Sequence, residues 1–255
     1  MFSKQVSRSS LLTVSALSVL TFLVVWELVC RVGVVDPIFL PPPSSVLGKG
    51  TQMMAEGSLI GHVLASSVRV MTGFFAAVII AIPLGIALGT SVIARAAFNP
   101  ILSFLRPLPS MSWIPLSLLW FGITETQKYS IVFMGAFAPA LVYVIEATRN
   151  VDPILIRAAQ NLGANRWQVM KEVILPGSLP QIFSGMKVIL GLAWTCVISA
   201  ELVAAREGLG FLIMNGKEFF QTEVVVLGMV MISITVLITD FIFRKLEGWA
   251  LRWQQ

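Results

Sequence analysis

The chain has 255 residues, of which 56% are hydrophobic and only 12% are charged. About a quarter of the residues in a soluble domain are charged, so too few polar side chains are present to cover a water-soluble fold of this length. The composition argues against a soluble enzyme, a secreted disulfide scaffold and a disordered protein, and it predicts an all-α polytopic membrane protein. In such a protein the net charge of +5 bears on orientation in the membrane, and we expect no nucleic-acid partner.

Six apolar segments are long enough to cross a bilayer, which takes about 20 residues of helix. The first, 11–30, follows Lys4 and Arg8 as a signal peptide would. It is longer than a usual signal-peptide core and no small-residue cleavage site follows it, so we interpret it as a retained anchor. The other predicted spans are 63–89, 97–120, 128–145, 178–204 and 224–243.

The distribution of Lys and Arg predicts the orientation. Six spans place both termini on one side, and the loops on that side hold ten positive residues against four in the opposite loops. Positive residues are retained on the cytoplasmic side. We therefore expect both termini in the cytoplasm of a multi-pass protein.

Two of the outer loops have a character of their own. Loop 31–62 contains Pro41-Pro42-Pro43, a stiff stretch without backbone donors, and we interpret it as a spacer. Segment 207–223 alternates aromatic and polar residues. Its pattern fits a segment lying at the membrane interface and equally one dipping part-way into the protein.

The connection between the fourth and fifth spans, 146–177, is long for a helix-to-helix loop and is expected to have structure of its own. Asp152-Pro153 is a typical helix start, and Gly163 suits a turn. A second short helix is predicted over 165–173, with Pro176 ending it. Each predicted helix has one apolar face, which favours docking into the groove of a partner.

This loop resembles the EAA loop of binding-protein-dependent ABC importer permeases. The family pattern is Glu-Ala-Ala, three residues, Gly, nine residues, then Ile-x-Leu-Pro. The chain has Arg157-Ala158-Ala159, Gly163 and Val173-Ile174-Leu175-Pro176 at that spacing. Arg157 stands where the family has Glu, so contacts that the family makes through this carboxylate are not carried over.

The resemblance covers about residues 36–250 and is to the taurine, aliphatic-sulfonate and nitrate branch of these permeases. The segments that carry it are 39–43, 62–69, 106–115, 119–122, 200–205 and 208–211. It implies the type I importer permease fold, in the cell inner membrane. The implied partners are a second permease subunit in a homodimer, two ATP-binding subunits and a periplasmic or surface-anchored substrate-binding protein.

The same resemblance implies that the EAA helices couple the permease to the ATP-binding subunits. The implied coupling residues are Arg157, Ala158, Ala159, Leu162, Gly163, Ala164 and Trp167. The chain itself has no phosphate-binding loop of the form GxxxxGK[ST]. We expect no cofactor in this chain, with ATP and Mg²⁺ bound by the partner. One histidine and two cysteines predict no metal site.

Polar residues at membrane depth are costly and mark candidate functional positions. One face of the fifth span carries Lys187, Gly191, Trp194, Ile198 and Glu201, at steps of four and three residues. We interpret this stripe as lining a translocation pathway. The alternative is that both charges lie at helix ends and extend to the interfaces.

Arg106 is the further pathway candidate, and it lies where the third predicted span carries prolines. Proline breaks regular helix, and broken helices at membrane depth often border transport sites. A guanidinium can donate two parallel hydrogen bonds to an anion such as a sulfonate. The alternative is a structural tie to backbone carbonyls or to a neighbouring acid.

The predicted function is that of the transmembrane permease subunit of an ATP-driven importer. It would pass a small organic anion, foremost taurine or another sulfonate, into the cytoplasm by alternating access. Nitrate or another small nutrient is the alternative substrate. A stand-alone secondary transporter is the alternative mechanism, although its inverted repeats are not visible. A membrane enzyme would need clustered His, Asp, Glu or Cys residues, which the chain lacks.

Overall fold

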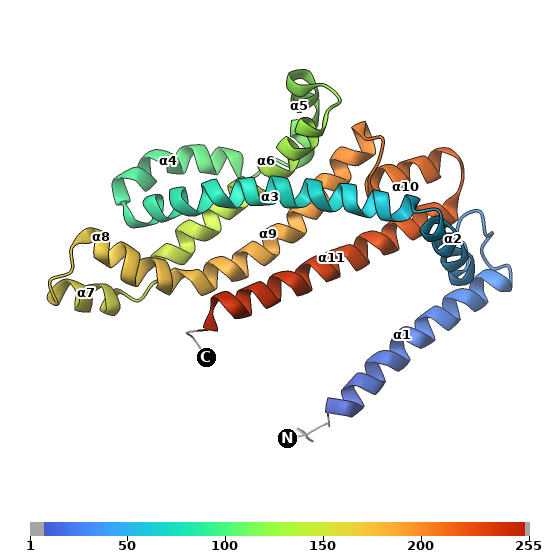
Figure 1. Ribbon diagram of the computed structural model, residues 1–255, viewed down its shortest axis with the longest axis horizontal. Coiled ribbons are helices and arrows are strands. Elements are labelled where there is room, and N and C mark those ends of the chain that lie inside the picture. Colours follow the sequence, from blue (N-terminus) through green and yellow to red (C-terminus); the bar gives the residue numbers. More distant parts are fainter. Residues whose placement is uncertain (1–7, 253–255) are drawn as a thin grey trace.

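The structure is a computed structural model that describes residues 8–252, so Lys4 lies outside the described residues. Every regular element in this range is a helix, and most pack into one elongated bundle (Figure 1). In chain order they are α1 (Arg8–Arg31), α2 (Pro43–Ala55), α3 (Ser58–Thr90), α4 (Val92–Leu105), the 3₁₀-helix η1 (Ser110–Trp113), α5 (Ile114–Phe121), α6 (Glu125–Arg149), α7 (Pro153–Asn161), α8 (Arg166–Gln168), the π-helix η2 (Val169–Ile174), α9 (Leu175–Ala204), α10 (Leu209–Glu218) and α11 (Thr222–Ala250).

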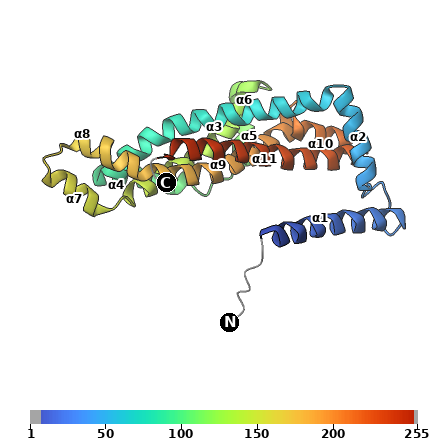
Figure 2. The same ribbon diagram turned by 60° about the horizontal axis from the view of Figure 1, so that its bottom comes forward.

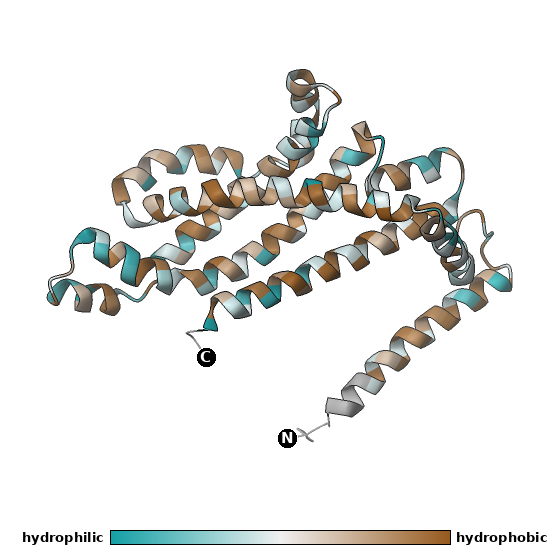
Figure 3. Cartoon of the chain, in the orientation of Figure 1, coloured by the Kyte–Doolittle hydropathy of each residue, from teal (hydrophilic) through white to brown (hydrophobic). Residues whose placement is uncertain are grey.

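Five of the six predicted spans are confirmed as helices long and apolar enough to cross a membrane. They are Thr13–Arg31, Ser58–Thr90, Glu125–Arg149, Arg166–Ala204 and Thr222–Ala250. Figure 3 shows apolar residues along most of their length, whereas the tip formed by α7 and α8 mixes polar and apolar residues. This tip is here called the α7 end of the bundle, and the opposite end is called the α10 end.

The centre of the bundle is the close contact between α3 and α6. Small residues let the two backbones approach, as they do where membrane helices pack. A Cβ atom added at Gly73 would lie 2.5 Å from Val132 Cβ, one at Gly85 2.6 Å from Val144 Cβ, and one at Gly89 2.7 Å from Thr148 Cβ. Because the sequence separation is the same in all three pairs, α3 and α6 run parallel.

Helix α9 packs antiparallel against α6, since Gly135 faces Cys196 whereas Gly185 faces Tyr143. The α9 residues on this side are fully buried, among them Ile189, Ala193 and Val197. Helix α11 then covers α9 and α3, with the ring of Phe243 against those of Phe74 and Phe183. The helices α3, α6 and α9 therefore form the core.

The predicted span 97–120 is not one helix long enough to cross a membrane, and the break that its prolines predicted is present. Helix α4 ends at Leu105, and α5 begins at Ile114 after a turn and η1. Pro107 and Pro109 lie in that turn, where their missing N–H groups and fixed φ angles stop the helix. Because α3 and α6 are parallel, this broken segment connects the α7 end of α3 to the α10 end of α6.

The predicted helix-turn-helix loop is present at the α7 end. The Asp152 side chain accepts a hydrogen bond from Ile154 N at the start of α7. Gly163 has a φ of 85°, and the amide of Ala164 donates to the carbonyl of Ala159 over 3.0 Å. With the bond from Gly163 N to Gln160 O, this is a Schellman motif, whose left-handed position favours glycine.

Pro176 was predicted to end the second loop helix, and this is wrong. Helix α8 continues through η2 into α9, and Pro176 lies in the first turn of α9. The first helical turn tolerates proline because its amide needs no partner inside the helix. The wider π-helical turn of η2, just before it, accommodates the missing donor.

Two segments interpreted as loops contain helices. Within 31–62, α2 packs on α11, with Leu227 Cδ1 3.1 Å from a Cβ added at Gly50. Within 207–223, α10 buries Leu209 and Leu212 against its neighbours, which favours the alternative that this segment enters the protein. Helix α1 stands apart from the bundle in both ribbon views (Figure 2).

Candidate functional site

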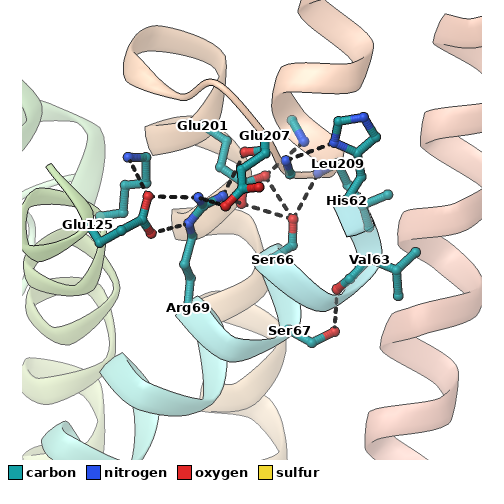
Figure 4. Close-up of polar contacts among 12 residues, drawn as sticks. His62, Val63, Ser66, Ser67, Arg69, Glu125, Glu201, Glu207 and Leu209 are labelled. Carbon is teal, nitrogen blue, oxygen red and sulfur yellow. Dashed lines mark hydrogen bonds and ion pairs between the residues drawn. The ribbon is translucent and has the colours of Figure 1, made fainter. Parts of the chain in front are cut away.

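A buried ion cluster at the α10 end joins the three core helices (Figure 4). Arg69 of α3 is 2% exposed. Its Nε and Nη2 atoms donate to the two carboxylate oxygens of Glu125 of α6 over 2.6 and 2.8 Å. Its Nη1 atom donates to Glu201 Oε1 of α9 over 2.8 Å and to the Glu207 carbonyl over 2.7 Å. One guanidinium thus fixes the ends of α6 and α9 to α3.

The Glu201 carboxylate also holds the turn between α9 and α10. Its Oε2 atom accepts from the amide of Gly210 over 2.9 Å, and Ser66 Oγ lies 2.9 Å from both carboxylate oxygens. Gly208 has a φ of 115°, and a Cβ atom there would collide with the carboxylate of Glu201. The Gly208 amide donates to His62 Nδ1 over 3.1 Å. The turn is therefore closed around the carboxylate.

This cluster was not foreseen from the sequence. Glu201 was expected in the pathway. The available signal was a Ser-x-x-Arg pattern in one span and a Glu in another. A charged Arg or Glu side chain is costly at membrane depth unless it is paired. Nothing in the sequence showed which acid meets which base.

The remaining stripe residues of α9 mostly contact α11. Lys187 forms an ion pair with Glu247. Trp194 is 2% exposed, and its Nε1 donates to Thr239 Oγ1 over 3.2 Å. Gly191 is exposed and Ile198 is half-buried. The stripe is one face of the helix, as predicted, but Lys187, Trp194 and Glu201 are all engaged inside the chain. That these stripe residues line a translocation pathway stays a prediction.

Arg106 lies at a cavity of about 190 Å³ beside the break between α4 and η1, here called the break cavity. Its other walls come from the middle of α6, over 134–139, and the middle of α9, over 192–196. Cys196 Sγ and Ser110 Oγ are 3.1 Å apart and connect α9 to the break. Arg106 is exposed, and its guanidinium has no hydrogen bond or ion pair with any side chain described in 13–252.

An aromatic pocket of about 210 Å³ adjoins the break cavity. Trp113 and Met134 line both spaces. The aromatic walls of the pocket are completed by Trp120, Phe121 and Phe133. An unpaired guanidinium and an aromatic surface thus lie side by side near the middle of the bundle.

Most of the predicted coupling residues lie on the exposed surface of the loop. Leu162 is 88% and Trp167 66% exposed, although both are large and apolar. Arg157, Ala158 and Gly163 are exposed too. Ala159 and Ala164 are half-buried and pack inward on a small core formed by Val151, Val169 and Ile174. Exposed apolar groups on a rigid loop are typical of a docking surface.

Within the described residues there is no group of three or more His, Cys, Asp or Glu side chains that would hold a metal ion. The described residues form a bundle of long apolar helices, a broken helix that borders a cavity near the middle of the bundle, and a helical loop exposed at one end. These features define a polytopic membrane transport protein.

The comparison with known families is specific. The model of the "Binding-protein-dependent transport system inner membrane component" family matches residues 81–250, and the chain belongs to this family. It is therefore a permease component of a transport system, located in the inner membrane.

Curated relatives cover nearly the whole chain. The taurine transport system permease protein TauC of Escherichia coli is 40% identical over 94% of this chain and 89% of its own length. A putative aliphatic sulfonates transport permease protein, SsuC of Bacillus subtilis, is 32% identical over 90% of this chain and 83% of its own. The nitrate import permease protein NrtB of Leptolyngbya laminosa is 29% identical over 84% and 71%.

Solved structures share the fold. A chain of the inward-facing MetNI methionine ABC transporter matches with a TM-score of 0.66 at 21% identity, covering 76% of this chain and 96% of its own. An amino acid ABC transporter with histidines matches with a TM-score of 0.57 at 18% identity, over 79% and 96%. The all-helical fold predicted from the sequence is that of an ABC importer permease.

Proposed function

We propose that this permease component serves an ATP-driven importer of a small organic anion, foremost taurine or another sulfonate. The observation that carries the proposal is Arg106, an unpaired guanidinium beside a cavity near the middle of the bundle. A planar guanidinium matches the oxygens of a sulfonate and can donate two hydrogen bonds to them. The identity to the taurine and sulfonate permeases supports the same substrate class.

The aromatic pocket suits the other end of such a substrate. Taurine carries an ammonium group two carbons from its sulfonate, and aromatic faces attract ammonium groups. Trp113 belongs to both spaces, so a molecule held at Arg106 extends toward the rings of Trp120 and Phe133. Simple alkanesulfonates would place an alkyl chain there instead. Nitrate, the alternative substrate, would occupy the break cavity alone.

The proposed topology has six crossings with both termini in the cytoplasm. The broken segment from α4 to α5 makes the third crossing, because it connects opposite ends of the parallel helices α3 and α6. The α7 end then faces the cytoplasm. Four Lys and Arg residues of loop 146–177 lie on that side, as the retention of positive charge requires.

The proposed partners follow from the two ends. At the cytoplasmic end, exposed Leu162 and Trp167 dock into an ATP-binding subunit, which holds the ATP and Mg²⁺, and two such subunits serve a pair of permeases. At the outer end a periplasmic or surface-anchored binding protein delivers the substrate. Alternating access then passes the anion between two identical permeases.

Uptake measurements test the proposal. The permease is reconstituted with its ATP-binding subunit in ATP-loaded proteoliposomes, with the binding protein outside, and uptake of labelled taurine, ethanesulfonate and nitrate is measured. We expect ATP-dependent uptake that Arg106→Gln lowers about tenfold, the loss of a charged hydrogen bond. Arg252→Gln, which removes an exposed arginine near the C-terminus, is the matched control.

Three results would each overturn part of this proposal. Uptake that proceeds without ATP or partner subunits would favour the secondary transporter. Full uptake by an assembled Arg106→Gln complex would remove Arg106 from the pathway, and preference for nitrate would replace the sulfonate assignment.

A further inference from the structure

Beyond the break cavity, two more cavities lead toward the α7 end. The first, of about 120 Å³, is lined by Arg106 together with Arg95 and Arg149, and is here called the arginine cavity. The second, of about 870 Å³, is lined by the same Arg95 and Arg149 together with Arg166 of the loop. Each cavity shares at least one arginine with the next, so the spaces form a series.

Helix geometry explains why these arginines line one route. Arg95, Asn99, Leu102 and Arg106 are spaced by four, three and four residues, which puts them on one face of α4. Opposite them, Ile145 and Arg149 are four residues apart on α6. Eleven residues of helix span about 16 Å, roughly half of the hydrocarbon thickness. The series therefore extends from mid-depth to the loop.

The charge along this route is not balanced. Glu146 is the one acid among the residues lining the arginine cavity. Arg95 donates to the Gly89 carbonyl over 3.3 Å, whereas Arg149, like Arg106, makes no side-chain hydrogen bond or ion pair within residues 13–252. By contrast, Arg69 and Lys187 have acidic partners. Three arginines around one small space repel one another unless an anion lies between them.

We infer that Arg95 and Arg149 form a second anion subsite, which receives the substrate after Arg106 and releases it toward the cytoplasm. A water needs about 10–15 Å³ of such space, so 120 Å³ admits a sulfonate or nitrate group with attendant waters. A second, weaker site beside the first lowers the barrier to release, because an ion must be able to leave as well as enter. This inference rests on the proposed anion transport.

A plain alternative explains positive residues at this end by orientation alone, since any Lys or Arg on the cytoplasmic side would serve. The two explanations predict different effects when an arginine is replaced by an uncharged residue. If only orientation matters, removing Arg95 or Arg149 is equivalent to removing Arg252, which lines none of the three cavities. If they bind the anion, the anion on the cytoplasmic side competes for them.

The test uses the reconstituted complex in ATP-loaded proteoliposomes, whose lumen is the cytoplasmic side. Uptake of labelled taurine is measured with and without unlabelled ethanesulfonate in the lumen, for the native chain, Arg95→Gln, Arg149→Gln and Arg252→Gln. We expect each of the first two substitutions to lower uptake about tenfold, as loss of a charged hydrogen bond does. We also expect lumenal ethanesulfonate to slow the native complex and Arg252→Gln, but not the other two.

The outcomes separate the two proposals. If the native complex takes up neither sulfonates nor nitrate, the proposed function fails, and this inference with it. If the native complex transports and Arg95→Gln and Arg149→Gln match it in rate and in sensitivity to lumenal anion, the subsite is refuted while the importer remains. Arg149→Lys tests folding, because it keeps the charge; it should restore most of the uptake and the sensitivity.

Discussion

The buried cluster at the α10 end gives a sharp energetic prediction for Arg69→Met. This substitution removes four donor contacts of 2.6 to 2.8 Å, to Glu125, Glu201 and the Glu207 carbonyl. The two carboxylates are then left in different surroundings. The side chain of Glu125 is 48% exposed and keeps Lys128 at 3.0 Å, so water and the lysine compensate it. The side chain of Glu201 is 0% exposed, and within residues 13–252 it pairs with no other cation.

The size of the stability loss in Arg69→Met is set by Glu201. Leaving one buried charge without its partner costs about 3–5 kcal/mol of the free energy of unfolding. Adding Glu201→Gln removes that charge, while the amide oxygen still accepts from Gly210. The double variant retains only the loss of ordinary hydrogen bonds, about 1–2 kcal/mol. We therefore expect the second substitution to rescue the first by about 2–3 kcal/mol.

The measurement is equilibrium unfolding in mixed micelles of a mild detergent and dodecyl sulfate, followed by tryptophan fluorescence, for both single variants and the double. Arg31→Met, which opens an exposed pair with Glu27, is the control and should change little. If Arg69→Met is no more harmful than Arg31→Met, or if Glu201→Gln makes the double variant worse, Glu201 is not a buried carboxylate dependent on Arg69.

Two other substitutions test the turn and the helix contact. Gly163→Val forces a β-branched residue to a φ of 85°, at a cost of about 1–2 kcal/mol. In a pull-down with the ATP-binding subunit, Gly163→Val should lose binding while its membrane insertion is unchanged. Gly163→Asn should retain binding, because asparagine tolerates this φ and nothing lies within 4 Å of the added Cβ. Gly85→Ala brings its Cβ to 2.6 Å from Val144 Cβ and should lower stability by about 1–3 kcal/mol in the unfolding assay. Gly61→Ala is the control on the same helix, because its added Cβ meets open space, and it should not lower stability. Equal losses of stability in the two variants would contradict the α3–α6 contact.

Local signals in the sequence were sufficient for the loop. Asp152-Pro153 starts α7 with a side-chain cap and a first-turn proline, and Gly163 supplies the left-handed residue that ends it. Both effects act over one helical turn and need no tertiary contact. The end of the second helix was missed because Pro176 terminates a helix or opens one, depending on the turn before it, and the π-helical turn is not encoded by any single residue.

The sequence by itself determined that the chain is helical and lies in lipid, because every backbone group in a bilayer needs a partner within its own segment and about 20 apolar residues suffice. It also placed Arg106 at a break, since proline acts locally. The tertiary structure alone decided which charges meet. The register of α3 on α6 brings Arg69 to Glu125, and the antiparallel α9 adds Glu201, 132 residues away along the chain. Such pairs depend on how whole helices pack, and packing is set by small residues such as Gly73 and Gly85, whose role appears only when the facing helix is known.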